Sequence, residues 1–278
     1  MADKGISYEN YTETSQTYDN GRVPASAGDW IEKIKGHFAD ASLVTVLDAG
    51  CGTGNYAFEI APFVSKVVGA DANAGMLERA RSKGASRSVA NIDWQHCSLL
   101  EPLPFAQASF DVVIVNQVIH HLASDEDTSI LNGVFREFNR VTKPNGLLLL
   151  NCTPAEMANM IWFVQLIPSA LARYSQRIPT AAQLKEMIGT AGYSAITIEK
   201  RHFIFFKEHI WKDLDGPLDA TWRNLASLWK LAEPEELENA LRKYAKMSTE
   251  ERRALLAKGE ELRLANGSCL LFTAVKST

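Results

Sequence analysis

Apolar and polar residues follow two different periods along this chain, and their alternation predicts an α/β protein. Short aliphatic and β-branched runs predict strands at 44–48, 66–71, 111–115 and 147–150, and an alternating run predicts another at 91–98. Amphipathic segments with helical spacing lie between them, at 29–38, 55–64, 73–83 and 125–140. Because strands alternate with helices, the pattern favours a doubly wound parallel sheet with helices on both faces.

The chain after residue 154 has a different texture. An apolar helical pattern covers 155–176 with a kink expected at Pro168, and a second helix is expected over 180–191 with Thr180 as its N-cap. A strand is predicted over 194–206, helices over 207–265 with a capping box at Ser248, and a last strand over 268–275. We therefore expect an N-terminal segment at 1–37, a core at 38–154 and a helical cap with the last two strands at 155–278.

The first predicted strand runs into a glycine turn, Asp48-Ala-Gly50-Cys-Gly52-Thr-Gly54. Glycines let a ligand approach the main chain, and the helix that follows offers unpaired N–H groups. A dinucleotide site uses G-x-G-x-x-G and places a pyrophosphate on the helix N-terminus. Here Asn55 holds the sixth position and Asp48 precedes the turn, and a carboxylate at that place favours a ligand with an ammonium group.

This turn resembles motif I of the class I S-adenosylmethionine-dependent methyltransferases, whose D-x-G-x-G-x-G it matches at every defined position. Leu103-Pro-Phe and the run 141–150 are similar to further family motifs. The resemblance implies S-adenosyl-L-methionine as cofactor. It also implies a seven-stranded sheet in the order 3-2-1-4-5-7-6 with the seventh strand antiparallel, an N-terminal helical lid, and a helical cap inserted around the sixth and seventh strands.

The resemblance assigns one set of residues to the adenosine half of the cofactor. Asp71 ends the second predicted strand about 20 residues past the glycine turn, where an acid accepts hydrogen bonds from ribose hydroxyls, with Ala72 beside it. An ordinary helix N-cap is the alternative for Asp71. Met76 is placed under the adenine, although a core methionine fits equally well. Ser98 and Leu99 stand where the family has an acid and a backbone donor for the adenine, so the sequence departs from the family there.

A second set is assigned to the methionine half and to the chemistry. Asn116 and Gln117 end the strand at 111–115, at the edge where open α/β sheets bind ligands. His120 or His121 is a candidate general base; the alternative is that both brace the following helix. The string Tyr18-Asp-x-x-Arg22 is similar to a lid motif, in which the tyrosine or arginine meets the cofactor's carboxylate, whereas a surface turn with a solvated arginine is the plain alternative.

Composition narrows the range of partners. The 278 residues are 46% hydrophobic, enough for a full core, and the net charge of -4 argues against nucleic acid as a partner. The four cysteines are scattered without a CxxC pair, so we expect no metal site and a reducing compartment. The polar N-terminus is not a signal peptide, and no apolar run is long enough for a membrane span. These features predict a cytoplasmic protein.

The expected function is in-line methyl transfer to a small-molecule acceptor, giving S-adenosylhomocysteine. The cap carries aromatic residues, and an anionic group of the acceptor is expected to pair with one of the arginines at 173, 177, 201 and 223. Cys152 is either a lining residue of that pocket or a buried thiol. Alternatives are a non-catalytic regulatory module that binds S-adenosylmethionine, and a protein or RNA methyltransferase. The cap is alternatively a dimer surface, so the chain is expected to be a monomer or a homodimer.

Overall fold

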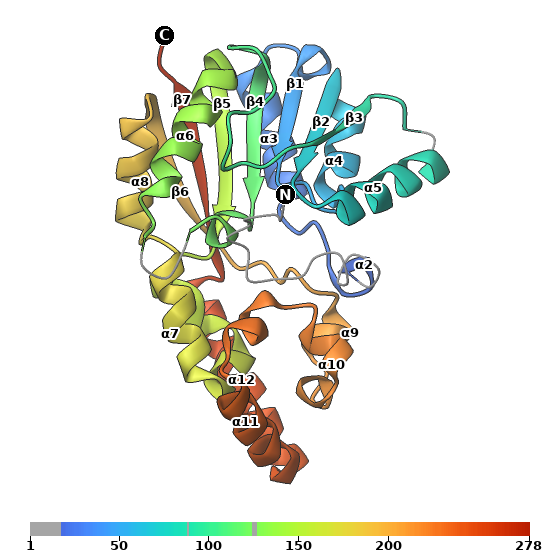
Figure 1. Cartoon of the computed structure of the whole chain (residues 1–278), viewed down its shortest axis with the longest axis vertical. Helices are drawn as coiled ribbons and strands as arrows, with labels where there is room; N and C mark the ends of the chain where they lie inside the picture. The colour runs from blue at the N-terminus through green and yellow to red at the C-terminus, as the bar shows by residue number, and fades with distance from the viewer. Residues whose placement is uncertain (1–17, 88, 124–126) are drawn as a thin grey trace.

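The computed structural model describes residues 18–87, 89–123 and 127–278 (Figure 1). The predicted lid at 1–37 and the predicted helix at 125–140 therefore lie partly outside the described residues. The central element is a seven-stranded sheet in the order β3-β2-β1-β4-β5-β7-β6. Neighbouring strands pair in parallel except β7, which is antiparallel to both β5 and β6. The predicted fold class and strand order are confirmed.

The strands follow the buried apolar runs closely. Their bounds are β1 Thr45–Ala49, β2 Lys66–Asp71, β3 Ile92–His96, β4 Phe110–Asn116, β5 Thr142–Cys152, β6 Tyr193–Arg201 and β7 Cys269–Lys276. The segment 142–146 lies inside β5 as a bulge, because the register with β4 passes from Thr142 directly to Leu147. Gly146 is required there, since a Cβ atom on it would lie 2.7 Å from the Asp111 carbonyl oxygen.

Helices cover both faces of the sheet (Figure 1). The bounds around the sheet are α3 Ala27–His37, α4 Asn55–Ile60, α5 Ala74–Arg87, α6 Ile130–Val141 and α8 Ala181–Thr190, with short 3-10 turns η1 Ala41–Leu43, η2 Ala61–Phe63 and η3 Ile119–His121. Alternate residues of each central strand face opposite sides. Val46 and Val112 pack with α3 and α4, whereas Leu47 and Val113 pack with α6. The central strands β1 and β4 are therefore buried on both faces, as their uninterrupted apolar runs predicted.

The cap forms the lower part of the molecule in Figure 1, below the carboxyl ends of the parallel strands. Its elements are η4 Ala155–Met160, η5 Trp162–Leu166, α7 Pro168–Arg177, α9 Glu208–Trp211, η6 Gly216–Leu218, α10 Ala220–Arg223, η7 Ser227–Leu231, α11 Pro234–Lys246 and α12 Thr249–Asn266. The predicted kinked helix at 155–176 is wrong. Two 3-10 segments precede α7, and Pro168 begins that helix, where its missing N–H costs nothing. The predicted N-cap Thr180 and the predicted capping box at Ser248 are confirmed, and the structure shows that Thr180 also forms a capping box.

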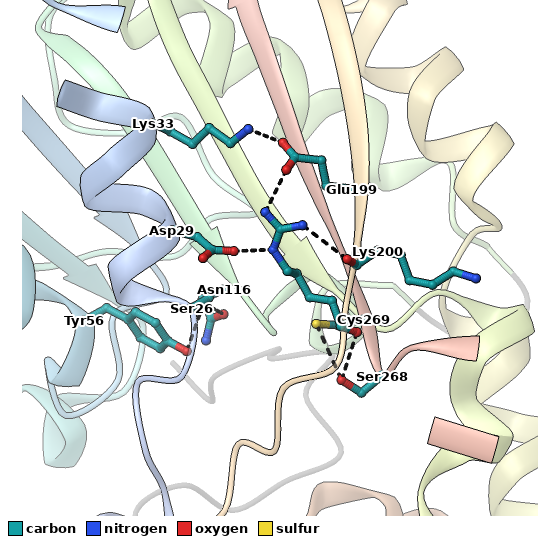
Figure 2. Close-up of polar contacts among 10 residues, drawn as sticks. Ser26, Asp29, Lys33, Tyr56, Asn116, Glu199, Lys200, Ser268 and Cys269 are labelled. Carbon is teal, nitrogen blue, oxygen red and sulfur yellow. Dashed lines mark hydrogen bonds and ion pairs between the residues drawn. The ribbon is translucent and has the colours of Figure 1, made fainter. Parts of the chain in front are cut away.

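The N-terminal segment joins the sheet and the cap. After α2, Tyr18–Gly21, the main chain pairs with the connection that leaves β6: the Val23 N–H donates to the Phe205 carbonyl at 3.0 Å, and the Lys207 N–H donates to the Gly21 carbonyl at 2.8 Å. The predicted strand at 194–206 therefore ends at Arg201, because residues beyond it make this link. Figure 2 shows how α3 is fixed to β6, through ion pairs of Asp29 with Arg201 and of Lys33 with Glu199.

The aromatic residues of the cap pack against one another and continue the hydrophobic core on the α6 face of the sheet. The rings of Phe163 and Trp229 stack with centroids 5.2 Å apart, and Trp162 and Trp222 pack beside them. Trp162 is completely buried and donates its indole N–H to the Trp211 carbonyl at 3.0 Å. Within the described ranges, no helix combines the length and the apolar content that a membrane crossing requires.

Candidate functional site

A pocket lies at the carboxyl ends of β1 and β4, between the glycine turn and the cap. One wall comes from the sheet edge and the turn, and the other comes from the N-terminal segment and the cap. The lining residues are Tyr18, Arg22, Val23, Asp48, Gly50, Cys51, Gly52, Thr53, Asn55, Tyr56, Asn116, Gln117, His120, His121, Thr153, Met160, Ile161, Phe163, Tyr174, Phe203, Ile204, Phe205, Phe206, Trp211, Ala226, Ser227, Leu228, Arg263 and Ser268. The position agrees with the rule that open α/β sheets bind ligands at this edge.

The structure brings together most residues predicted for the methionine half and the chemistry. Those at the pocket wall are Tyr18, Arg22, Asp48, Gly50, Gly52, Asn116, Gln117, His120 and His121. The residues predicted for the adenosine half lie outside that wall, along the ends of β2 and β3; they are Asp71, Ala72, Met76, Ser98 and Leu99. Gly54 of the turn is also outside it. Their roles toward a cofactor stay predictions.

Glycine occurs at the three positions of the turn for different physical reasons. All have a left-handed backbone, with φ of 75° at Gly50, 55° at Gly52 and 77° at Gly54. A Cβ atom on Gly50 would lie 2.5 Å from the Val118 side chain, and one on Gly54 would lie 2.3 Å from the Trp94 ring. A Cβ atom on Gly52 meets no heavy atom within 4 Å. Gly50 and Gly54 therefore permit close packing, while Gly52 leaves space at the pocket wall.

The turn is not arranged to bind a phosphate. The Gly52 N–H donates to Asp71 Oδ2 at 2.8 Å. At the start of α4, Asp19 Oδ1 accepts hydrogen bonds from Thr53 Oγ1 at 2.6 Å and from Asn55 Nδ2 at 2.9 Å. The Asp71 carboxylate thus takes up one backbone N–H of the turn, and the Asp19 carboxylate lies at the start of α4, the place where a pyrophosphate binds in dinucleotide enzymes. A further anion at this place would be repelled.

Asp48 is the most perturbed carboxylate of the site. Its side chain is 2% exposed, and among the described residues its Oδ2 atom has no hydrogen-bond partner. Burial, and then the nearby charge of Asp71, raise the pKa of Asp48 to about 7. A buried carboxylate without a cation is costly, so the site would be stabilised by a ligand that brings a positive group to Asp48.

Asp71 organises the turn from the neighbouring strand. Besides the Gly52 N–H, it accepts the Asn73 N–H at Oδ1, at 2.8 Å. Burial raises the pKa of Asp71, although these backbone hydrogen bonds oppose the shift. Asp71 is not the cap of α5, because the side chain of Asn73 accepts the Met76 N–H at 2.9 Å. The N-cap alternative therefore applies to Asn73, and the Asp71 carboxylate keeps acceptor capacity for a ligand beyond the backbone N–H groups that it binds.

The residues predicted around the adenine have mixed surroundings. Met76 and Leu99 are buried, at 2% and 5% exposure, whereas Ala72 is exposed. Ser98 Oγ accepts a hydrogen bond from the Leu100 N–H at 3.2 Å, so it is already engaged as an acceptor. A core role for Met76 and a local turn for Ser98 thus account for their positions without a ligand.

His120 and His121 form a pair of tilted rings after the end of β4, and His120 is buried while His121 is half-buried. Their ring centroids are 4.0 Å apart, and the His120 ring lies 5.3 Å from that of Tyr174. Burial, with the positive charges of Arg22 and Arg177, lowers the pKa of His120 to about 3. Burial also moves the pKa of His121 well below its usual value. Both rings are therefore neutral at pH 7, and such weak bases remove a proton poorly, which favours the bracing role.

The end of β4 is held in place by its neighbours. Ser26 Oγ, at the start of α3, lies 3.2 Å from the Tyr56 hydroxyl and 3.5 Å from Asn116 Oδ1 (Figure 2). Gln117 has a left-handed backbone with φ of 51°, which is uncommon for a residue with a side chain. Its N–H donates to the Asn151 carbonyl at 2.8 Å. Backbone strain of this kind is concentrated at functional sites.

Arg22 is held over the pocket by aromatic rings. Its guanidinium carbon lies 4.3 Å from the centroid of Phe206 and 5.5 Å from that of Tyr18. Its Nε atom is buried and has no hydrogen-bond partner among the described residues. The Arg22 side chain is therefore half-buried between these rings rather than fully solvated.

Some lining residues were missed, and some predicted ones are elsewhere. Thr53, Tyr56 and Thr153 line the pocket, and Thr153 follows directly after the end of β5, so its place at the ligand edge was a usable signal. Cys152 is fully buried and does not line the pocket, which confirms the buried thiol. None of the cap arginines at 173, 177, 201 and 223 lines the pocket either.

Comparisons with known proteins agree with this geometry. Residues 47–150 match the model of a family described as a methyltransferase domain. The chain is 41% identical over 107 residues to a malonyl-[acyl-carrier protein] O-methyltransferase of Legionella pneumophila, across 37% of this chain and only 34% of that protein. It is 27% identical over 217 residues to a demethylmenaquinone methyltransferase of Lactococcus lactis, across 69% of this chain and 83% of that protein.

A solved structure shares the fold. It is a putative methyltransferase from an antibiotic biosynthesis pathway of Anabaena variabilis, with a TM-score of 0.64 and 19% identity. The superposition covers 91% of this chain and 98% of that one. At this identity the likeness concerns the fold alone.

Proposed function

The chain belongs to the class I S-adenosylmethionine-dependent methyltransferases, and from this premise we propose that it transfers a methyl group from S-adenosyl-L-methionine to a small-molecule acceptor. One observation carries the proposal: Asp48 presents a buried carboxylate oxygen without a partner among the described residues, near the second carboxylate of Asp71. A ligand with an ammonium and a sulfonium group supplies the positive charge that this place lacks. The residues present therefore fit the cofactor.

The chain's own residues divide between the two ends of that cofactor. Asp48 would hold the ammonium group, while Arg22 and Tyr18 at the opposite wall would hold the carboxylate. Gly52 leaves room for close approach of the ligand to the main chain. Asp71 would accept hydrogen bonds from the ribose hydroxyls through its remaining lone pairs.

The other predicted residues would contact the remaining parts of the cofactor. Asn116 and Gln117 would face the methionine part, and Ala72, Met76, Ser98 and Leu99 would surround the adenosine part. Bound S-adenosyl-L-methionine supplies a methyl group already activated by the sulfonium. The protein then has to align the acceptor and exclude water, which the cap and the N-terminal segment do by covering the pocket. No strong base is required when the acceptor arrives in a reactive form.

Binding of S-adenosylhomocysteine, the demethylated cofactor, tests the first half of this proposal by calorimetry. Asp71→Ala is expected to weaken binding more than about tenfold. The matched control is Asp93→Asn, whose exposed carboxylate pairs with Lys66 at the surface. Melting temperatures must accompany both variants, because Asp71 also holds the turn. Unchanged affinity in a folded Asp71→Ala protein contradicts the assignment.

Transfer of an isotope-labelled methyl group tests the second half. The protein and labelled cofactor are incubated with a cell extract that is separated into metabolites, proteins and RNA. Label in the metabolite fraction is expected. Label in protein or RNA supports the macromolecular alternative, and tight binding of S-adenosylhomocysteine without any transfer supports the regulatory alternative.

A further inference from the structure

The arginines expected to bind an anionic acceptor are engaged elsewhere. Arg173 donates to the Leu231 carbonyl at 3.0 Å, Arg177 to the Ala123 carbonyl at 3.2 Å, and Arg223 to the Pro217 carbonyl at 2.7 Å. Arg201 is held between Asp29 and Glu199 (Figure 2). Since none of the four lines the pocket, the cap offers the acceptor no cation from this group.

The charges that do line the pocket are few. Among the described lining residues the carboxylate is that of Asp48, and the arginines are Arg22 and Arg263. Arg263 is 8% exposed and compensated, because its Nε and Nη2 atoms lie 3.0 and 2.8 Å from the two carboxylate oxygens of Glu260. Under the proposed function, Asp48 and Arg22 are taken by the cofactor. Among the described lining residues, the part of the pocket left for the acceptor then has no uncompensated charge.

The rest of that space is apolar or neutral. Met160, Ile161, Phe163, Ile204, Phe206 and Trp211 supply hydrocarbon and ring surface from the cap. The imidazoles of His120 and His121 are neutral at pH 7, since burial lowers the pKa of both. Neutral hydrogen-bonding groups, among them Gln117 and Thr153, lie at the sheet edge. An unpaired ion moved into such surroundings loses its hydration without compensation.

We infer that the methyl acceptor is an uncharged, largely apolar molecule, with its polar group directed at the sheet edge beside Gln117 and its hydrocarbon body against the cap. This inference rests on the proposed function, because it assigns Arg22 to the cofactor. An anionic acceptor would instead need Arg22 for itself, and a cationic one would need a carboxylate beyond Asp48.

Three probes with the same hydrocarbon body test the inference. They are 2-(1-naphthyl)ethanol, protonated 2-(1-naphthyl)ethylamine and 1-naphthaleneacetate, each titrated at pH 7 into protein saturated with S-adenosylhomocysteine. Trp211 lines the pocket, so tryptophan fluorescence reports binding. The alcohol is expected to bind at least about tenfold more tightly than either ion. An ion that binds within that margin, or more tightly, overturns the inference.

A pair of variants locates the probes in the pocket. Phe203 is half-buried at the pocket wall, and Ile198 lies on β6 outside it with 37% exposure. Phe203→Lys is expected to raise the affinity for naphthaleneacetate at least about tenfold, whereas Ile198→Lys leaves it unchanged. Equal effects of the two variants mean that the probes bind elsewhere and overturn the inference. If Phe203→Lys does not fold, the probe series on the unmodified protein still decides.

Binding of S-adenosylhomocysteine, measured first, separates the two possible failures. If S-adenosylhomocysteine does not bind, the proposed function fails. If it binds and the protein prefers a charged probe, only the inference about the acceptor is overturned.

Discussion

Asp19 Oδ1 accepts a hydrogen bond from Thr53 Oγ1 at 2.6 Å, and this contact joins the N-terminal segment to the glycine turn. Lys83 Nζ, on α5, lies 2.9 Å from the other oxygen of Asp19. Burial on its own raises the pKa of Asp19, but the hydrogen bonds from Thr53 and Lys83 outweigh it and lower the pKa. The Asp19 carboxylate thus connects the N-terminal segment to both the glycine turn and α5.

Asp19→Asn is expected to loosen this connection. Charged hydrogen bonds contribute about 1.5–3 kcal/mol each, so S-adenosylhomocysteine should dissociate about tenfold faster. Stopped-flow tryptophan fluorescence measures this rate. Asp40→Asn, which alters an exposed cap of η1, serves as the matched control. An unchanged dissociation rate in Asp19→Asn means that the contact does not retain the ligand.

Asp48→Asn is expected to stabilise the ligand-free protein at high pH. The folded-state pKa of about 7 lies above the ordinary 3.8, so the stability linked to Asp48 is fully present below 3.8 and is lost as pH rises through 7. At about 1.4 kcal/mol per pKa unit, removing the charge restores up to about 4 kcal/mol at pH 8. Denaturant unfolding at pH 5 and pH 8 tests this: a similar difference between variant and parent at both values contradicts it.

The sequence was informative where a single local pattern determines the structure. The buried strands were predicted because uninterrupted apolar runs such as 111–115 and 147–150 leave little choice in a covered sheet. The glycine turn was predicted because three left-handed positions require glycine. The pocket wall next to it followed from the topology, since the ends of β1 and β4 lie side by side.

Other features depend on contacts between distant segments, and local patterns do not contain them. The role of Asp19 requires Thr53 and Lys83, which are far away in sequence and have no periodicity in common with it. The cap was predicted as helical, but its apolar residues suit 3-10 segments equally, and Pro168 marks a helix start as readily as a kink. The cap arginines were misjudged, because a charged residue does not reveal its partner.

The affinity for S-adenosylhomocysteine is expected to depend on pH through Asp48. The ammonium group of S-adenosylhomocysteine pairs with the ionised Asp48 carboxylate. The affinity should therefore be constant above pH 7 and should fall by up to about tenfold per pH unit below pH 7, where Asp48 of the free protein takes up a proton. His120, with a pKa of about 3, stays neutral over this range and does not contribute. Calorimetry in buffers of different ionisation enthalpy measures the proton released on binding. In Asp48→Asn the dependence should be absent, and a persistent slope there assigns it to another group.

Ser26→Ala tests whether α3 positions the end of β4. The hydroxyl of Ser26 is fully buried and lies between the Tyr56 hydroxyl and Asn116 Oδ1 (Figure 2). Its loss lets the Asn116 amide turn, which should weaken contacts to the amino-acid part of a ligand only. We therefore expect about a fivefold loss of affinity for S-adenosylhomocysteine and none for 5′-methylthioadenosine, which lacks that part, since a neutral hydrogen bond contributes about 1 kcal/mol.

The control for this prediction is Ser42→Ala, whose hydroxyl bonds the exposed Asp40 at the far end of β1. It should leave both affinities unchanged. Equal losses for the two ligands in Ser26→Ala would mean that the buried hydroxyl only supports the packing of α3 against Tyr56. A loss confined to S-adenosylhomocysteine supports instead that Asn116 faces the amino-acid part, because Asn116 is the β4 residue that the Ser26 hydroxyl contacts.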